Sequence, residues 1–265
     1  MKNRFAPALV LLAAPFAALA QTNPWDAPIS LGVGLFHADA ATSVRLDSND
    51  GRLGTQLSFE GDLGGEQRKT LPTFDFAWRF NPRHALEASV VSLHRDGQRT
   101  LTGNINWGEV TFPVNTSVDS EFNSDIVRVA YRYSPWHDNN MEVGLLLGLH
   151  YTKLSTSITS VAGTISQEAS VKYPLPTLGV RGSVRIAEGW RLAGFGQVLK
   201  VKIGDYDGEL YNFAGGVEWA FTHEMIAGLG YEHYKYNLTS SKERARGEFD
   251  YQFDGPKLYF SWNFR

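Results

Sequence analysis

Apolar and polar residues alternate in short segments that recur along the whole chain. In the C-terminal segment KLYFSWNFR, every second residue is apolar: Leu258, Phe260, Trp262 and Phe264. Successive side chains of a β-strand point to opposite faces, so this spacing predicts a strand with one apolar and one polar face. The same alternation occurs in TFDFAWRF (73–80), MEVGLLLGLHYT (141–152), PTLGVRGSVRI (176–186) and YNFAGGVEWAF (211–221). Helical periodicity is missing, and the chain is predicted to be all-β.

Ten such strands are predicted, and the four segments 73–80, 141–152, 176–186 and 211–221 are each about ten residues long, which suits a tilted strand that crosses a bilayer. The ten strands span residues 29–46, 70–80, 84–95, 124–134, 141–153, 174–186, 190–202, 209–221, 224–236 and 249–264. The segment GTQLSFEGDLGG (54–65) could form an external hairpin, a piece that enters the lumen, or part of an extra strand pair that raises the number to twelve. Residues 95–122 are interpreted as two strands that continue above the membrane to a tip near Gly108.

Alternation alone does not distinguish a membrane barrel from a soluble β-barrel, which turns its apolar side inward. Short connections at 81–84, 134–140, 187–189 and 222–224 alternate with longer ones, as periplasmic turns alternate with outside loops in outer-membrane barrels. Five tryptophans at or near these short connections or the C-terminus predict an aromatic girdle at one membrane interface: Trp78, Trp136, Trp190, Trp219 and Trp262. We therefore predict a transmembrane, antiparallel, up-and-down β-barrel, with a soluble exported β-barrel binding protein as an alternative.

Residues 1–20 have the anatomy of a secretory signal peptide. Lys2 and Arg4 precede the apolar FAPALVLLAAPFAAL, and the small-residue pattern of a cleavage site ends at Ala20. Residues 21–28 are predicted to be a periplasmic N-terminal lead, and residues 29–265 the barrel. The chain contains no Cys, which leaves no disulfide framework and no site for a lipid anchor. Its formal net charge of −3 does not indicate a nucleic-acid-binding protein, which would usually be basic.

The closing strand resembles the C-terminal assembly signal of Gram-negative outer-membrane β-barrel proteins, because its aromatics alternate and Phe264 is almost terminal. It departs from that signal in the Arg265 that follows. With YDGELYNF (206–213) and DGPKLYFSWNF (254–264), the chain resembles a proteobacterial group of such proteins without assigned activity. The resemblance implies a multi-pass barrel in the cell outer membrane, contact with outer-membrane lipids and lipopolysaccharide, and assembly by the barrel assembly machinery through the C-terminal strand. It carries no catalytic signature.

Strand parity directs many ionisable side chains into the lumen. The predicted lumen network comprises Asp75, Arg79, Glu87, Arg128, Arg132, Glu142, His150, Arg181, Arg185, Glu218, Glu232 and Lys257. Buried charges must be paired to be tolerated, so these residues should form a network across the lumen. A barrel of this size is only slightly wider than the barrels of about eight strands that side chains just fill, so no open pore is expected. Any residual leak should favour anions, because inward basic residues are in excess.

Candidate catalytic residues are few. Ser92 and His94 share one strand face near the outer rim and could serve as nucleophile and base of an outer-leaflet lipid hydrolase, of the lipid A deacylase or phospholipase type. No orienting carboxylate can be assigned to them from the sequence. No cluster has metal-ligand spacing, and no cofactor motif is present. Apolar residues around Trp107 at the hairpin tip either form a surface for a partner or pack against one another across the hairpin. The favoured function is an integral outer-membrane barrel with a polar, salt-bridged lumen, structural or narrowly permeable in a porin-like way, and not an enzyme.

Overall fold

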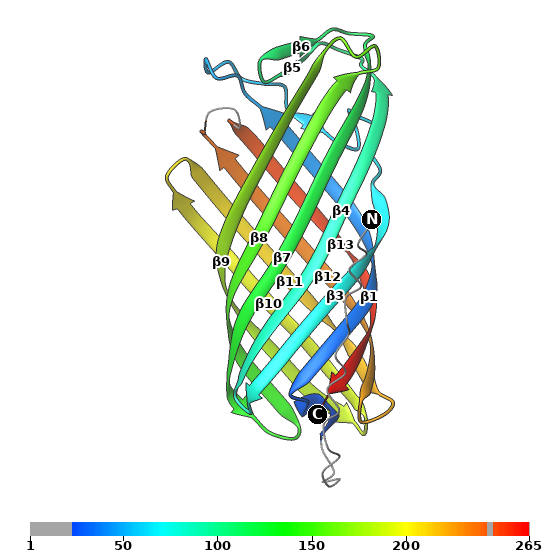
Figure 1. Ribbon diagram of the computed structural model, residues 1–265, viewed down its shortest axis with the longest axis vertical. Coiled ribbons are helices and arrows are strands. Elements are labelled where there is room, and N and C mark those ends of the chain that lie inside the picture. Colours follow the sequence, from blue (N-terminus) through cyan, green and yellow to red (C-terminus); the bar gives the residue numbers. More distant parts are fainter. Residues whose placement is uncertain (1–22, 243–245, 265) are drawn as a thin grey trace, which may run out of the picture.

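Ten long antiparallel strands form a closed barrel (Figure 1) in the part of the chain that the structure describes. This structure is a computed structural model, and it describes residues 23–242 and 246–264, without the side chains of residues 173, 203 and 206. The barrel strands are β1 (Ile29–Leu46), β3 (Arg68–Asn81), β4 (His84–Thr100), β7 (Ser117–His137), β8 (Met141–Ser160), β9 (Ser166–Ala187), β10 (Trp190–Ile203), β11 (Tyr206–Ala220), β12 (Met225–Ser240) and β13 (Gly247–Phe264). The predicted all-β fold and its ten barrel strands are confirmed, and the predicted signal peptide lies outside the described residues.

The first and last strands close the barrel. β13 pairs with β1 from Ile29–Phe264 at one end to Leu46–Gly247 at the other. Each remaining barrel strand pairs with its neighbours in chain order. The β1–β13 pairing therefore leaves no free strand edge at this seam, as a barrel in hydrocarbon requires.

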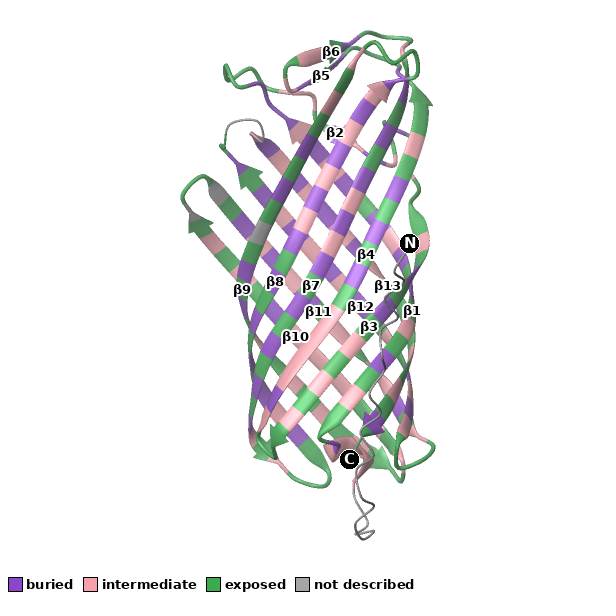
Figure 2. Cartoon of the chain, in the orientation of Figure 1, coloured by how far each residue is buried: buried purple, intermediate pink, exposed green. Residues whose placement is uncertain are grey.

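The two faces of each strand exchange polarity about half-way along the barrel, and β7 shows this clearly. The end of the barrel with the short turns is named periplasmic after the predicted topology. Near this end, the outward residues of β7 are exposed and apolar: Val127, Val129, Tyr131 and Tyr133. Its outward residues toward the outer loops are polar: Asp119, Glu121, Asn123 and Asp125. Inward, the order is reversed, with Arg128 and Arg132 below the apolar Phe122. Figure 2 shows the alternation of buried and exposed residues that continues through both halves.

Exposed apolar side chains form a belt around the periplasmic half. The structure places all five predicted girdle tryptophans in this belt near its periplasmic edge, with 41 to 65% of their surface exposed: Trp78, Trp136, Trp190, Trp219 and Trp262. The belt on β8 runs from Met141 to Tyr151, which matches the length of about 9–11 residues that a tilted strand needs to cross the hydrocarbon. Among the described residues, no helix is long and apolar enough to span a bilayer.

An apolar core fills the outer half of the barrel. Opposite walls meet in this core: the ring centroids of Phe122 on β7 and Tyr251 on β13 are 5.2 Å apart. The rings of His150 on β8 and Tyr234 on β12 stack at 6.1 Å. The outer half therefore packs like two sheets placed face to face. Its apolar side points inward, as the soluble alternative predicts for the whole chain, but this arrangement is limited to the outer half.

The segment 54–65 enters this core. Its short strand β2 (Leu57–Ser58) pairs with β1, and Phe59 and Leu63 are fully buried. Among the three arrangements considered from the sequence, the structure thus contains the piece that enters the lumen. Arg95 of β4 anchors it, because the fully buried guanidinium lies 2.5 Å from a carboxylate oxygen of Glu60.

A small hairpin covers the outer end of the barrel. It consists of β5 (Ile105–Trp107) and β6 (Val110–Phe112), joined by a turn in which Gly108 has a φ of 59°. Such a positive φ favours glycine. Trp107 and Phe112 are fully buried against the core. Of the two arrangements expected near Trp107, a partner surface or internal packing, the structure contains the packed one, because these side chains complete the core.

The seam between β9 and β10 opens toward the outer end. Its described ladder ends at the Leu178–Val198 pair, whereas β8 and β9 remain paired up to Thr159–Ser166. Pro174 and Pro176 lie in the upper part of β9. A proline has no N–H to donate and is tolerated at a free strand edge, so these two residues explain why β10 does not pair there. In Figure 1 the outer parts of β9 and β10 diverge.

Candidate functional site

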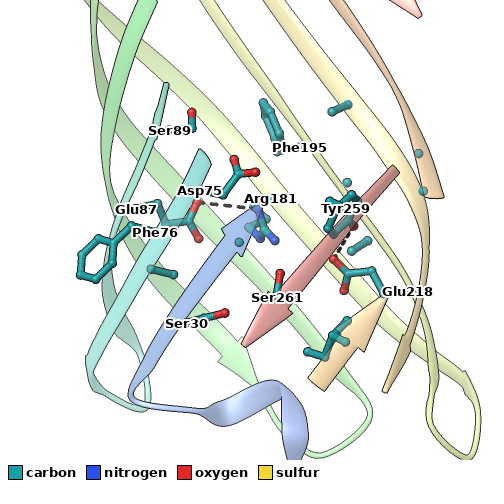
Figure 3. A pocket seen from close by; sticks show the side chains of 18 of the residues that line it. Ser30, Asp75, Phe76, Glu87, Ser89, Arg181, Phe195, Glu218, Tyr259 and Ser261 are labelled. Carbon is teal, nitrogen blue, oxygen red and sulfur yellow. Dashed lines mark hydrogen bonds and ion pairs between the residues drawn. The ribbon is translucent and has the colours of Figure 1, made fainter. Parts of the chain in front are cut away.

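The periplasmic half of the barrel contains a polar cavity of about 250 Å³. Side chains from strands on all sides point into it (Figure 3), including Asp75, Glu87, Arg181, Glu218 and Tyr259. The apolar core lies above it. Along the strands, the inward residues are apolar in the outer half and ionisable around the cavity. This change occurs at the same level at which the outward residues change from polar in the outer half to apolar in the belt.

The N-terminal lead forms the floor of this cavity. Its short 3-10 helix η1 (Pro24–Asp26) lies at the periplasmic end, and Trp25 is among the lining residues. The Arg191 guanidinium lies 4.1 Å from the Trp25 ring centre, in cation–π geometry. Asp26 lies 3.3 Å from a ring nitrogen of His137. These contacts hold the lead against the barrel.

A chain of ion pairs crosses one side of the lumen. The Arg79 guanidinium donates to both oxygens of Glu142, at 2.9 and 3.1 Å, and the Ser134 hydroxyl donates to the same carboxylate at 2.5 Å. Arg132 connects Glu142, at 3.5 Å, with Glu87, at 2.9 Å. These residues lie on β3, β4, β7 and β8, so their charges are balanced between strands that are distant in the sequence.

Two further pairs join other parts of the barrel wall. Arg128 on β7 pairs with Glu232 on β12, and its Nε also donates to the Ser89 hydroxyl at 2.7 Å. Lys257 on β13 donates to Asp75 on β3 at 2.8 Å. Both pairs link strands that are not adjacent in the sheet.

Glu218 and Arg181 lie near the middle of the cavity. Glu218 accepts hydrogen bonds from Arg191 and, at 2.7 Å, from the Tyr259 hydroxyl. Arg181 approaches Glu87, but its nearest carboxylate oxygen is 3.7 Å away. Figure 3 shows Arg181 between the Asp75–Glu87 side and the Tyr259–Glu218 side.

Two members of the predicted lumen network lie outside these ion pairs. His150 is fully buried above the cavity, where a ring nitrogen lies 3.3 Å from the Gln197 side-chain oxygen. Arg185 lies opposite Arg191 in the β9–β10 ladder, and no ion pair joins it to a carboxylate of the described residues. The structure brings the other ten together: Asp75, Arg79, Glu87, Arg128, Arg132, Glu142, Arg181, Glu218, Glu232 and Lys257.

The predicted network did not include Tyr259, whose hydroxyl donates to Glu218. Strand parity already places Tyr259 on the polar side of KLYFSWNFR.

Ser92 and His94 lie outside the barrel, just above the apolar belt. A His94 ring nitrogen is 2.9 Å from Asp125, which lies directly opposite Ser92 on β7. Partial burial opposes ionisation of Asp125, but hydrogen bonds from the His94 and Ser92 side chains outweigh it and lower the pKa of Asp125. The sequence could not supply this carboxylate because it belongs to another strand. No hydrogen bond joins Ser92 to His94 in the described structure.

The Asp125 carboxylate belongs to a polar strip across neighbouring strands, defined here as His94, Asp125, Lys153 and Lys172. Lys153 lies opposite Asp125, and Lys172 lies opposite Lys153. Within the described ranges, no group of three or more His, Asp or Glu side chains is arranged to hold a metal ion.

Comparison with solved structures finds the same architecture in the outer-membrane protease OmpT of Escherichia coli. The TM-score is 0.60 at 12% identity, over 89% of this chain and 96% of OmpT. The protein is a β-barrel of the outer-membrane type. Its fold and its exposed apolar belt place it in the outer membrane of a Gram-negative cell, with the belt facing lipid. At this identity the likeness to OmpT is one of fold.

More distant barrels also match this outer-membrane chain. The transport unit of the autotransporter AIDA-I from Escherichia coli gives a TM-score of 0.43 at 9% identity, over 93% of each chain. Ail, the attachment invasion locus protein of Yersinia pestis, gives 0.36 at 12% identity, over 87% of this chain and 97% of Ail. No protein-family model matches the sequence, and a search of curated proteins finds no match.

Proposed function

We propose that this outer-membrane barrel is closed, with a structural role or narrow permeability, and is neither a general porin nor an enzyme. The observation that carries the proposal is the filled interior of its outer half. Phe36, Phe122, Tyr251 and Phe253 are at most 2% exposed there. The segment 54–65 adds further apolar side chains to the same core. Ions cross such a region poorly, because its packed side chains are mainly apolar and its Arg95 and Glu60 charges already pair with each other.

The salt-bridged lumen below supports the same proposal. Its side chains fill space and neutralise one another, so the barrel has no need of a wide column of water to solvate them. The remaining polar volume is the cavity of about 250 Å³, with Trp25 in its floor. Solutes then reach the cavity from the periplasm when the lead moves aside, and do not pass through the apolar core.

Planar-bilayer recording tests this proposal directly. The unmodified protein should show no large, steady conductance. Deletion of residues 55–65 removes Phe59 and Leu63 from the core and should raise the conductance, with a preference for anions because the lumen has excess basic residues. Leu53→Ser, at a site that is 72% exposed, should leave the recordings unchanged. A large and steady cation-selective conductance from the unmodified protein would contradict the proposal.

The polar strip outside the barrel favours a contact with lipopolysaccharide. Lys153 and Lys172 lie directly opposite each other on neighbouring strands, an arrangement that repulsion between like charges disfavours. An anion between them would relieve the repulsion, and phosphate accepts strong charge-assisted hydrogen bonds from lysine. The strip lies just above the apolar belt, where lipopolysaccharide phosphates lie. The His94–Asp125 pair also keeps a second candidate open, a hydrolase that acts on outer-leaflet lipid.

One experiment separates contact from hydrolysis. Lipopolysaccharide should co-purify with the wild-type protein and less with Lys153→Gln/Lys172→Gln, whereas Arg83→Gln in a periplasmic turn should bind like the wild type. Incubation with lipopolysaccharide or phospholipid should release no fatty acid. Release that is abolished in His94→Ala and in Ser92→Ala would instead establish the lipid hydrolase.

A further inference from the structure

Among the described cations that line the cavity, Arg181 lies farthest from its nearest carboxylate and has no hydrogen bond to a described residue. Arg79, Arg128 and Arg191 each donate to a carboxylate. The Arg181 guanidinium has only the ion pair of 3.7 Å with Glu87, and it lines the cavity. A guanidinium carries five N–H donors in a fixed fork. Those of Arg181 therefore face the open volume of the cavity without a protein acceptor (Figure 3).

The charges around the cavity leave Arg181 as the excess cation. Six cations line the cavity: Arg79, Arg128, Arg132, Arg181, Arg191 and Lys257. The five carboxylates beside them each have a close partner among the other five cations. Arg181 only shares Glu87, which Arg132 approaches more closely at 2.9 Å. A largely buried cation without a partner of its own is unfavourable, and a bound anion removes that cost.

The remaining walls suit a small ligand. Hydroxyl groups of Ser30, Ser89 and Ser261 line the cavity, and Phe195 adds an apolar surface. The volume of about 250 Å³ corresponds to several water molecules and lies below the usual range for drug-sized ligands. We propose that this cavity binds a small oxyanion, either a carboxylate or inorganic phosphate, through the guanidinium of Arg181. That fork can donate in bidentate geometry to two oxygens of a carboxylate or of a phosphate. The inference rests on the proposed closed barrel, because a lumen open at both ends would not retain a ligand.

Calorimetric titration of the purified full chain, in detergent and low-chloride buffer, tests the proposal. Acetate, succinate and inorganic phosphate are titrated separately to distinguish the two ligand classes, with choline as the cationic control. The wild type should bind at least one oxyanion saturably and should not bind choline. Arg181→Gln should weaken that binding at least about tenfold, as expected for loss of charge-assisted hydrogen bonds. Glu87→Gln should strengthen it about tenfold, because it removes the carboxylate that competes for Arg181.

Folding of these variants can be checked independently. Arg181→Gln should fold, because every lumen carboxylate keeps another cation; heat-modifiable gel migration verifies this. If Arg181→Gln does not fold, Arg181→Lys replaces it and should weaken binding because lysine lacks the fork. Arg68→Gln, at the exposed outer rim, should bind like the wild type. Absence of saturable oxyanion binding by the wild type, or unchanged affinity in the folded Arg181 variant, would overturn the site. A large conductance of the same preparation would overturn the closed barrel and the inference that rests on it, whereas a closed barrel without saturable binding would overturn the site alone.

Discussion

Replacement of Glu232 by alanine should lower the free energy of unfolding by about 3 to 5 kcal/mol, the usual cost of removing one partner of a buried ion pair. The Arg128 and Glu232 side chains are only 10% and 5% exposed. They lie on β7 and β12 and connect opposite walls of the barrel where the polar cavity meets the apolar core. Removal of Glu232 leaves the Arg128 guanidinium buried without its carboxylate, while Asp75 in the same cavity is held by Lys257 at 2.8 Å. Urea unfolding in lipid vesicles, followed by tryptophan fluorescence, measures the change.

Two controls isolate the effect of the charge. Glu121→Ala removes an exposed carboxylate of β7 and should change the unfolding free energy by less than about 0.5 kcal/mol. Arg128→Met/Glu232→Met removes both charges and should recover most of the lost stability, because apolar residues of similar volume can replace a buried pair. A Glu232→Ala protein as stable as the wild type would show that the pair is solvated and that the lumen is wetter than proposed.

Replacement of Trp107 by alanine should cost about 3 to 5 kcal/mol, the range for loss of a large aromatic side chain from a packed core. Trp107 has no exposed surface, although it belongs to a two-strand hairpin outside the main sheet. Its loss should also loosen that hairpin, so limited proteolysis should cut between Leu101 and Thr116. Leu53→Ala, at a site that is 72% exposed, is the matched control and should change neither measurement. Unchanged stability together with continued resistance to protease would show that the hairpin contributes nothing to the core.

The membrane half of the barrel could be predicted from the sequence because both strand faces carry a strong signal there. Aromatic and aliphatic residues mark the outward face in segments such as 73–80 and 258–264. Charged and small residues mark the inward face, so parity alone places Arg128 and Glu232 in the lumen. Parity does not say which inward charges meet. That choice depends on distances across the barrel, as in Arg128–Glu232, whose members are separated by 104 residues.

The outer half was harder to predict because alternation shows that the two faces of a strand differ, but it does not show which face points inward. Residues 117–126 alternate as regularly as residues 127–136, yet their apolar side points inward. The predicted strand began at residue 124, close to where the two patterns meet. The segment 54–65 and the Trp107 hairpin have too few residues to show a period, and their burial depends on contacts with distant strands. Asp125 was missed beside His94 for the same reason, since 31 residues separate them.

The exchange of polarity along each strand also fixes the depth of the barrel in the bilayer. A displacement toward the periplasm would bring Asp125 and Lys153 into hydrocarbon, whereas the opposite displacement would lift Val127 and Tyr151 into water. A charge on the lipid-facing surface costs up to about 2–4 kcal/mol near the midplane, and bilayer deformation costs only a fraction of a kcal/mol per Å. In a membrane of unsuitable thickness, the lipids around this barrel should therefore adjust while its vertical position stays constant.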